Sequence, residues 1–235
     1  MEIEETPYAE LPYSLPGFFS EKLGHRILKV MRLAMPSIIA ITITFGYAMV
    51  NTSFAGLLGD PHALAGLGLS NVLINGLWFT TFNGFSGALQ TMVSQAASIK
   101  DFDQCNNTLR AALVVLIALY IPLGLLLYNI DTIMGPSMLN ADPHSVQYAV
   151  TYTRTVMIGF FFEAIYDLEK KYLLQFGNAM YPMLIQFVTL PLHFLMVSQT
   201  YNWAPNSLKG IAIATNISFF LNFVALHVYL AYFTK

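Results

Sequence analysis

The sequence predicts an all-α, polytopic membrane protein built from six transmembrane helices. Apolar residues make up 56% of the 235 residues and charged residues only 10%, whereas soluble domains carry roughly 25% charged residues. A soluble domain of this composition would have too few polar residues to cover its surface. Six segments also have the roughly 20 mostly apolar residues that a membrane helix needs, and the basic residues gather on one side of them.

These six segments can be bounded from the sequence alone. They cover about 27–57, 63–98, 107–129, 145–167, 180–198 and 208–232. The second is too long for a straight perpendicular crossing, because at ~1.5 Å per residue it reaches roughly 50 Å against a hydrocarbon core of ~30 Å. We expect it to tilt, to project into the cytosol, or to bend at Gly76, Gly84 or Gly87.

The segments define two regions. Residues 1–26 begin with the acidic, proline-rich stretch MEIEETPYAELPYSLPGFF. This stretch lacks the basic start and apolar run of a signal peptide, so it is predicted to be a cytosolic arm. Residues 27–235 are predicted to form the membrane domain.

Basic residues predict the orientation of the membrane domain. Nine of the eleven precede or open the first helix, lie around the second and fourth connections, or lie at the C-terminus: Lys22, Arg26, Lys29, Arg32, Lys100, Arg110, Lys170, Lys171 and Lys235. Because basic residues concentrate on the cytosolic side, both termini are predicted to be cytosolic, which agrees with an even number of helices. Which cellular membrane holds the chain does not follow from the sequence.

Several function classes are excluded at this stage. A net charge of −2 argues against a nucleic-acid partner, whose binding depends on clustered lysine and arginine. The single cysteine, Cys105, forms neither an internal disulfide nor a paired-cysteine metal site. No nucleophile–base pair or phosphate-binding glycine loop is visible. We therefore expect no enzyme activity, metal or cofactor.

Four of the six helices carry a polar stripe at helical spacing. The stripes are Thr44, Tyr47 and Asn51; Asn83, Gly87, Gln90 and Ser94; Gln186, Thr189 and His193; and Thr215, Ser218 and Asn222. Each lies on one helix face. A single stripe is explained by interhelical hydrogen bonding, but four converging stripes favour a polar cavity, as in a transporter or channel.

Two ionisable residues lie well inside these segments. Glu163, in GFFFEAIYD, is either a proton-carrying acid or an interfacial carboxylate paired with a lysine such as Lys171. His193, in LPLHFLMV, is either a proton relay, because histidine titrates near neutral pH, or a neutral, hydrogen-bonded structural residue.

Four motifs in order resemble one transporter family. The stretches FAGLLGDPHALAGLGLSN and GFSGALQTMVSQA, then KKYLLQFGNAMYPML, then LKGIAIATNISFFLN are similar to the N-terminal lobe of multidrug and toxic compound extrusion (MATE) transporters, and most similar to eukaryotic members. The matching residues of the first two stretches are Phe54, Gly56, Leu58, Gly59, Gly87, Ala88, Thr91, Ser94, Gln95 and Ala96. The resemblance covers about residues 27–232.

This resemblance implies a fold, an activity and a site. MATE proteins have two six-helix lobes and export organic cations in exchange for protons or sodium, so the chain is expected to form one MATE-like lobe. Asn51 stands where many prokaryotic relatives have a cation-binding aspartate, and His193 stands near the position of its partner carboxylate. Thr189 and Thr215 match other polar positions of that pocket. Eukaryotic members place an essential glutamate in the second lobe, which this sequence does not contain.

The leading hypothesis is a half-size transporter that antiports organic cations, with a second lobe supplied by another copy or another chain. Asn51, Thr189, His193 and Thr215 are predicted to form its pocket, with Glu163 as a candidate proton carrier. The predicted cavity-lining residues are Tyr47, Asn83, Gln90, Thr91, Gln95, Gln186 and Asn222. The rival hypothesis is a transport-inactive structural subunit of a larger membrane complex, and a gene fragment is a third reading. All three have membrane lipids as partners.

Overall fold

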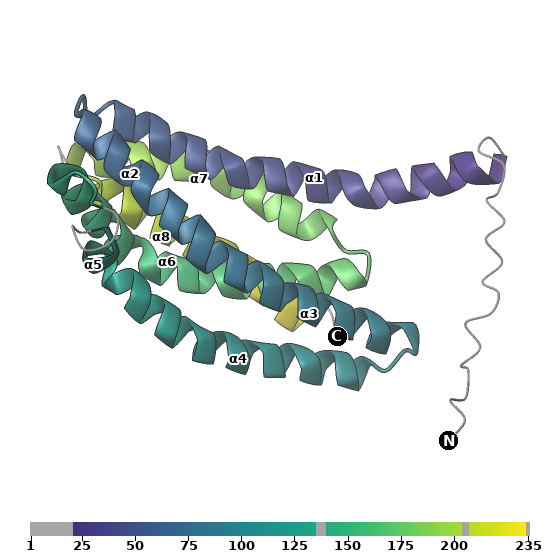
Figure 1. Cartoon of the computed structure of the whole chain (residues 1–235). Coiled ribbons are helices and arrows are strands. Elements are labelled where there is room, and N and C mark those ends of the chain that lie inside the picture. Colours follow the sequence, from purple (N-terminus) through teal and green to yellow (C-terminus); the bar gives the residue numbers. More distant parts are fainter. Residues whose placement is uncertain (1–20, 135–139, 204–206, 234–235) are drawn as a thin grey trace, which may run out of the picture. The chain divides into compact units, whose positions relative to one another are not determined.

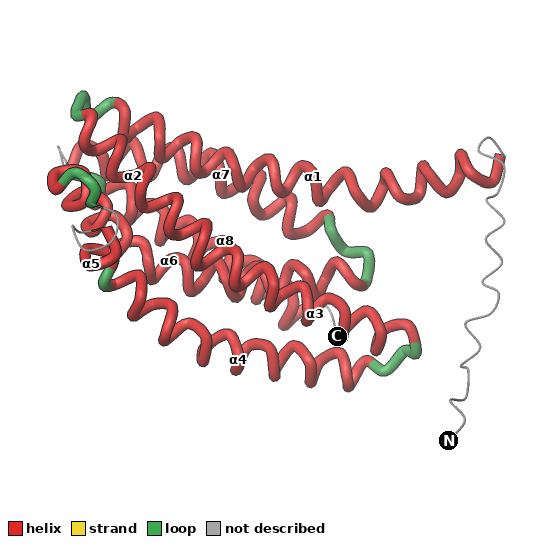
Figure 2. The backbone as a smooth tube through the Cα atoms, viewed as in Figure 1, coloured by secondary structure: helices red, strands yellow, loops and turns green. Residues whose placement is uncertain are grey.

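The structure is a computed structural model that describes residues 21–134, 140–203 and 207–233. Its helices are connected by short turns (Figures 1 and 2). In chain order they are α1 (Glu21–Gly56), α2 (Pro61–Leu73), the π-helix η1 (Ile74–Phe79), α3 (Thr80–Ser98), α4 (Phe102–Tyr128), α5 (Ile130–Met134), α6 (Pro143–Gln175), α7 (Met180–Trp203) and α8 (Lys209–Phe233).

The chain divides into two units, Met1–Met35 and Pro36–Lys235, and every contact discussed below lies within the second. Residues 1–20 of the predicted arm lie outside the described residues. From Glu21 the chain is helical, so the first helix begins before the predicted position 27. Pro36, at the boundary between the units, lies inside α1, where a proline removes one backbone hydrogen bond from the helix.

The predicted second helix is one continuous helical run, Pro61–Ser98, with a π-helical turn in its middle. Within this turn the backbone N–H and the side-chain hydroxyl of Thr80 both donate to the carbonyl of Asn75. Such single π turns occur often at functional sites. Gly76, one of the glycines at which a bend is expected, lies in this turn.

Of the six long helical segments in the described part of the chain, five are apolar enough to cross a membrane. They are Leu23–Gly56, Pro61–Ser98, Phe102–Tyr128, Met180–Trp203 and Lys209–Tyr232. α6 is long enough, at 33 residues, but it carries six charged residues and is therefore not among them. Five of the six predicted segments are thus apolar enough for lipid. The exception is the fourth predicted segment, α6, which differs because it is surrounded by protein.

α6 is the central helix of the bundle. It packs against α2, α3, α4, α5 and α8, and fourteen of its residues are buried, compared with five in α4. Glycines allow the closest approaches: a Cβ at Gly66 of α2 would lie 2.6 Å from the Ser145 carbonyl oxygen, and a Cβ at Gly159 would lie 2.8 Å from the Asn216 Cα of α8. The neighbouring helices therefore separate much of α6 from lipid.

The connections lie at two ends of the bundle (Figure 1). The α1–α2 turn and the start of α6 lie at one end, and the α3–α4 and α6–α7 turns lie at the other. At the first end, Asp60 and Asp142 cap the N-termini of α2 and α6, and His62 Nδ1 lies 3.0 Å from Asp142 Oδ2. Hydrogen bonds from the backbone and hydroxyl of Ser145, and then from His62, lower the pKa of Asp142.

Candidate functional site

Three of the polar stripes meet in one buried network. Asn51 of α1 lies at its centre, donating through Nδ2 to Thr215 Oγ1 of α8 at 3.1 Å and to the Tyr152 hydroxyl of α6 at 3.4 Å. Its Oδ1 lies 3.0 Å from Nε2 of His193 on α7. Four helices are thus connected through one side-chain amide.

A second half of the network lies one to two turns along the same helices. The Tyr47 hydroxyl lies 2.6 Å from Thr189 Oγ1, which is 2.5 Å from Asn222 Oδ1. Gln186 Nε2 donates to Thr44 Oγ1 at 3.3 Å. These contacts again join α1, α7 and α8, so the stripes connect helices in the way expected of polar groups at membrane depth.

The network is electrically neutral. His193 is completely buried, and its Nδ1 lies 2.8 Å from Ser218 Oγ. With its proton on Nε2, the neutral ring donates to Asn51 Oδ1, and its Nδ1 lies beside the Ser218 hydroxyl, which also donates to the Ala214 carbonyl. Its ring also packs 4.9 Å from that of Tyr47, and no carboxylate of the described residues is hydrogen-bonded to it. A protonated ring would therefore be a buried charge without an opposite charge in contact, which is costly.

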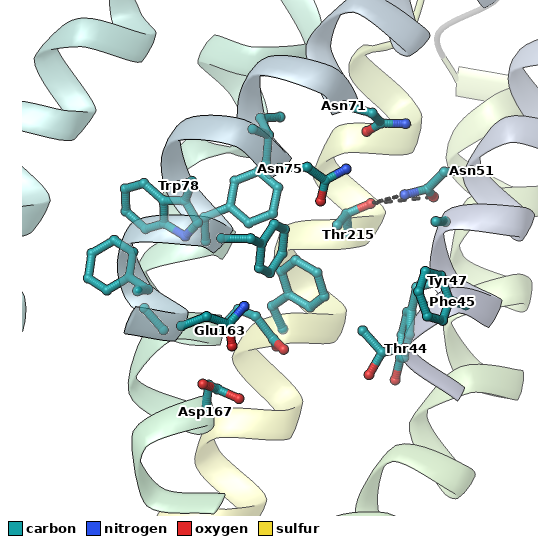
Figure 3. A pocket seen from close by; sticks show the side chains of 18 of the residues that line it. Thr44, Phe45, Tyr47, Asn51, Asn71, Asn75, Trp78, Glu163, Asp167 and Thr215 are labelled. Atoms are coloured by element: carbon teal, nitrogen blue, oxygen red, sulfur yellow. Dashed lines mark hydrogen bonds between the residues drawn. The ribbon is translucent and has the colours of Figure 1, made fainter. Parts of the chain in front are cut away.

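A cavity of about 380 Å³ lies beside this network, within the size range of ligand pockets. Asn51, Thr215 and Tyr47 border it on the network side, and Trp78, Phe79, Phe82, Phe160 and Phe219 supply aromatic walls. Asn71 and Asn75 add two amides from the α2–η1 run. Figure 3 shows α1 residues such as Thr44 and Tyr47 across the cavity from Glu163 of α6.

Glu163 is the buried carboxylate of this cavity. Its side chain is on the inner face of α6, and the residue is only 6% exposed. No hydrogen bond of Glu163 is found among the described residues, and its Oε2 is buried without a partner. More than nine in ten buried polar groups in proteins are hydrogen-bonded, so this oxygen is unusual, and its residue lines a space with room for a ligand.

The nearest charges along α6 are already paired with one another. Lys170 Nζ lies 2.8 Å from Asp167 Oδ1, and Lys171 Nζ lies 2.9 Å from Asp167 Oδ2. Lys171 also donates to Asn83 Oδ1 at 3.0 Å and contacts Ser86 Oγ. Asp167, Lys170 and Lys171 form what we call the ion cluster, which carries a net charge of +1 and lies one to two turns from Glu163. Neither lysine forms an ion pair with Glu163 within the described residues.

Comparison with known proteins places this arrangement in a family. Residues 36–198 match the MatE family description. The chain belongs to the MatE family. It is 26% identical over 210 residues to Protein DETOXIFICATION 9 of Arabidopsis thaliana, covering 87% of this chain and 42% of that protein. It is 24% identical to Multidrug and toxin extrusion protein 1 of Danio rerio, covering 86% of this chain and 35% of that protein.

Solved MATE structures share the fold. The crystal structure of the eukaryotic MATE transporter AtDTX14 superposes with a TM-score of 0.77 at 19% identity, covering 88% of this chain and 46% of that one. A MATE crystal structure in the bent conformation gives 0.77 at 18% identity. The chain spans less than half the length of these relatives. With five apolar helices long enough to cross a bilayer, it is an integral membrane protein with the fold of one MatE lobe.

Within this MatE lobe, the predicted pocket residues occupy two environments. All four lie in the network, but only Asn51 and Thr215 border the cavity, while Thr189 and His193 lie behind them. Gln186 and Asn222 are buried in the network too. Tyr47, Asn83 and Glu163 line the cavity.

The predicted cavity residues of α3 lie elsewhere. Gln90, Thr91 and Gln95 are not among the residues that line the cavity, and Thr91 and Gln95 are exposed. Thr91 donates to the carbonyl of Gly87 on its own helix at 3.1 Å. The stripe that begins at Asn83 therefore follows α3 away from the cavity, and only its first member reaches it.

Sequence reasoning missed several residues of this MatE site. Tyr152 completes the network from α6, and Asn71, Asn75, Trp78 and Phe82 line the cavity from the α2–η1–α3 run. The four-residue spacing of Asn71 with Asn75, and of Trp78 with Phe82, was the available signal. The π turn that contains Asn75 and Trp78 was not visible in the sequence.

Proposed function

We propose that this protein is a half-size MATE-like secondary transporter that exchanges organic cations for protons. Its MatE family membership and the cavity beside the network support this function. The observation that carries it is Glu163, a buried carboxylate with an unpartnered oxygen in an aromatic-walled cavity. One carboxylate can bind either a proton or an organic cation, and such mutually exclusive occupancy is what an exchanger needs.

Protons fit this site better than sodium as the coupling ion. The network offers amide and hydroxyl oxygens but no carboxylate, and hard cations favour carboxylate, carbonyl and water ligands. Sodium would leave its charge unbalanced there. In the proposed mechanism Glu163 carries the proton, Asn51 and Thr215 form the polar edge of the substrate site, and Thr189 and His193 hold the helices behind it.

Transport needs a second lobe in this proposal. Alternating access in transporters built from repeats involves movement of one repeat against another around a fixed site. A second copy of the chain or another lobe-sized chain would supply the opposing surface, with both termini in the cytosol as the distribution of basic residues indicates.

Reconstituted transport tests this function. The purified full chain is incorporated into liposomes, a pH gradient is imposed, and accumulation of a fluorescent organic cation is followed before and after the gradient is collapsed with an ionophore. We expect gradient-dependent accumulation in wild type and none in Glu163→Gln. Equal accumulation in the two would remove Glu163 from coupling. Native mass spectrometry of the same preparation gives the number of copies.

A structural subunit of a larger membrane complex is the second candidate. The observation that favours it is the network itself, because the hydrogen bonds of Asn51 and His193 are complete without an ion. This candidate predicts that the chain purified from its native membrane in mild detergent migrates with a stable set of unrelated proteins. It also predicts that liposomes containing the chain show no gradient-driven accumulation.

A further inference from the structure

We propose that the Glu163 cavity selects a monovalent protonated amine that keeps at least one N–H and carries an aromatic body, and that it rejects quaternary ammonium ions. This inference rests on the proposed function in one respect: it takes the cavity to be the substrate site. It goes further by assigning the chemistry of the headgroup, and it needs only one lobe.

The first step is the unmet acceptor. Oε2 of Glu163 is buried without a hydrogen-bond partner among the described residues, and an unsatisfied buried acceptor costs about 1–3 kcal/mol, more when it is charged. A ligand N–H can satisfy it with a charge-assisted hydrogen bond of about 2.7–2.9 Å. The methyl groups of a quaternary ammonium ion donate no such bond, and they hold the nitrogen farther from the oxygen.

Aromatic side chains form the walls of the cavity that Glu163 lines. Trp78 and Phe82 have ring centroids 4.5 Å apart, and Trp78 and Phe160 have centroids 6.1 Å apart. Phe219 continues this surface 5.8 Å from Phe160. Such rings favour a flat apolar body and also attract a nearby cation through their faces, so an arylalkyl amine matches both the walls and the carboxylate.

The third step limits the charge of the ligand. Asp167 and Lys170 of the ion cluster line the same cavity as Glu163, and Lys171, which also pairs with Asp167, brings the net charge of the ion cluster to +1. A single ammonium group at Glu163 is compensated by that carboxylate. A second ammonium group on the ligand would meet the surplus positive charge of the ion cluster, so diamines and polyamines are disfavoured.

Equilibrium binding tests the inference in the full chain, solubilised in detergent at neutral pH. Trp78 lines the cavity, whereas Trp203, the other tryptophan of the sequence, is 79% exposed at the end of α7. In a Trp203→Phe background the remaining tryptophan reports binding. The probes are 2-phenylethylammonium, its N,N,N-trimethyl analogue and 2-phenylethanol. We expect the primary amine to bind about tenfold or more tightly than either analogue, because a site built for a hydrogen bond rejects ligands that lack it.

Two variants make the result specific. Glu163→Gln is expected to abolish the preference for the amine. Glu169→Gln is the matched control, since Glu169 is also a buried α6 glutamate with an unpartnered Oε2 but pairs with His227 outside the cavity; it should keep the preference. Melting temperatures establish that each variant is folded, and Glu163→Asp, which shortens the reach of the carboxylate, is measured if Glu163→Gln fails to fold.

The outcomes separate this inference from the proposed function. Equal affinity for the amine and its trimethyl analogue, no binding of any probe, or a preference that survives Glu163→Gln overturns the inference. Selective amine binding without gradient-driven accumulation in liposomes overturns transport alone. Accumulation without amine selectivity overturns the inference and leaves transport standing.

Discussion

Two polar regions of this lobe differ in how completely their hydrogen bonds are satisfied. In the network around Asn51, amides, hydroxyls and an imidazole from four helices pair with one another and carry no charge. Across the cavity, Glu163 is a carboxylate with a buried oxygen that has no hydrogen-bond partner among the described residues. The network has more polar groups, but the single carboxylate has more unused bonding capacity.

The difference teaches where to look for a site in a membrane bundle. Polar groups at membrane depth stabilise helix association when they pair with one another. A large number of such groups therefore indicates helix packing as readily as it indicates a functional site. An ionisable group that remains unpaired is costly and is therefore a functional candidate by default. By this criterion we propose a structural role for the network and a functional role for Glu163.

Exchange of the carboxylate for an amide is the strongest way to break the comparison. Glu163→Gln is expected to eliminate gradient-driven accumulation and amine selectivity, because an uncharged amide neither carries a proton nor compensates an ammonium ion. The protein should remain as stable as wild type or become more stable, since the variant removes a buried ionisable group. Thermal melting in detergent, run beside the flux assay, checks both parts. A variant with lost flux and a much lower melting temperature would contradict this reading.

Removal of the His193 imidazole should lower stability and leave amine binding intact, the reverse of the result expected for Glu163→Gln. His193→Ala removes one hydrogen-bond partner from Asn51 and one from Ser218, and opens a space beside the Tyr47 ring. We expect roughly 2–3 kcal/mol of lost stability, measured by chemical denaturation in detergent. Binding of 2-phenylethylammonium, corrected for the folded fraction, should persist. Flux that disappears although the folded fraction and binding are normal would instead make His193 part of the proton path.

The close contact between α6 and α8 helps to set the distance between the Asn51 network and Glu163. A methyl group at Gly159 would lie 2.8 Å from Asn216 Cα, so Gly159→Ala must displace a backbone, and overpacking of this kind costs about 1–3 kcal/mol. Gly68→Ala is the matched control, because no atom lies within 4 Å of its added methyl group and alanine favours helix. Denaturation midpoints of both variants test the pair; equal midpoints would mean that α8 shifts freely.

Loss of the water-exposed N-cap of α6, Asp142, is expected to have the smallest effect on stability. Asp142 accepts from the Ser145 backbone and hydroxyl at 2.9 Å, which lowers its pKa below the ordinary value of 3.8. A lowered folded pKa adds stability at pH values above the unfolded pKa, and this stability is lost as the pH falls through the folded value. The melting temperature of wild type should therefore exceed that of Asp142→Asn slightly at pH 7.

The same cap makes a prediction along the pH axis. The small difference between wild type and Asp142→Asn should shrink only at acid pH, as the pH falls below the unfolded pKa near 4. Melting curves recorded from pH 7 down to acid pH check this. A difference that fades between pH 7 and 6 would contradict the assignment to the Asp142 carboxylate.

The sequence was sufficient for the family, the long helices and the convergence of three stripes. Thr44, Tyr47 and Asn51 meet Thr189, His193 and Thr215 because helical periodicity places each set on one face. Periodicity does not say where a face points along a long helix, so Gln90, Thr91 and Gln95 were expected at a cavity that only Asn83 reaches. Periodicity also does not reveal a π turn, and the π turn η1 changes which helix face the residues beyond it lie on.

Glu163 illustrates a different limit. Its two readings, a cavity acid or an interfacial partner of lysine, depend on a neighbour in space, and no local pattern decides between them. The structure pairs Lys170 and Lys171 with Asp167 instead. Because both lysines pair with Asp167, one helical turn after Glu163, neither forms an ion pair with Glu163.

The central position of α6 has a consequence for how the protein is made. A nascent helix enters the bilayer most readily when its own residues prefer lipid to water, and charged residues near the middle of a segment oppose this transfer by about 2.5–3.5 kcal/mol each. α6 has six charged residues, and its neighbours shield it only after they have assembled. Its insertion therefore depends on helices synthesised before and after it, including α8, against which it packs.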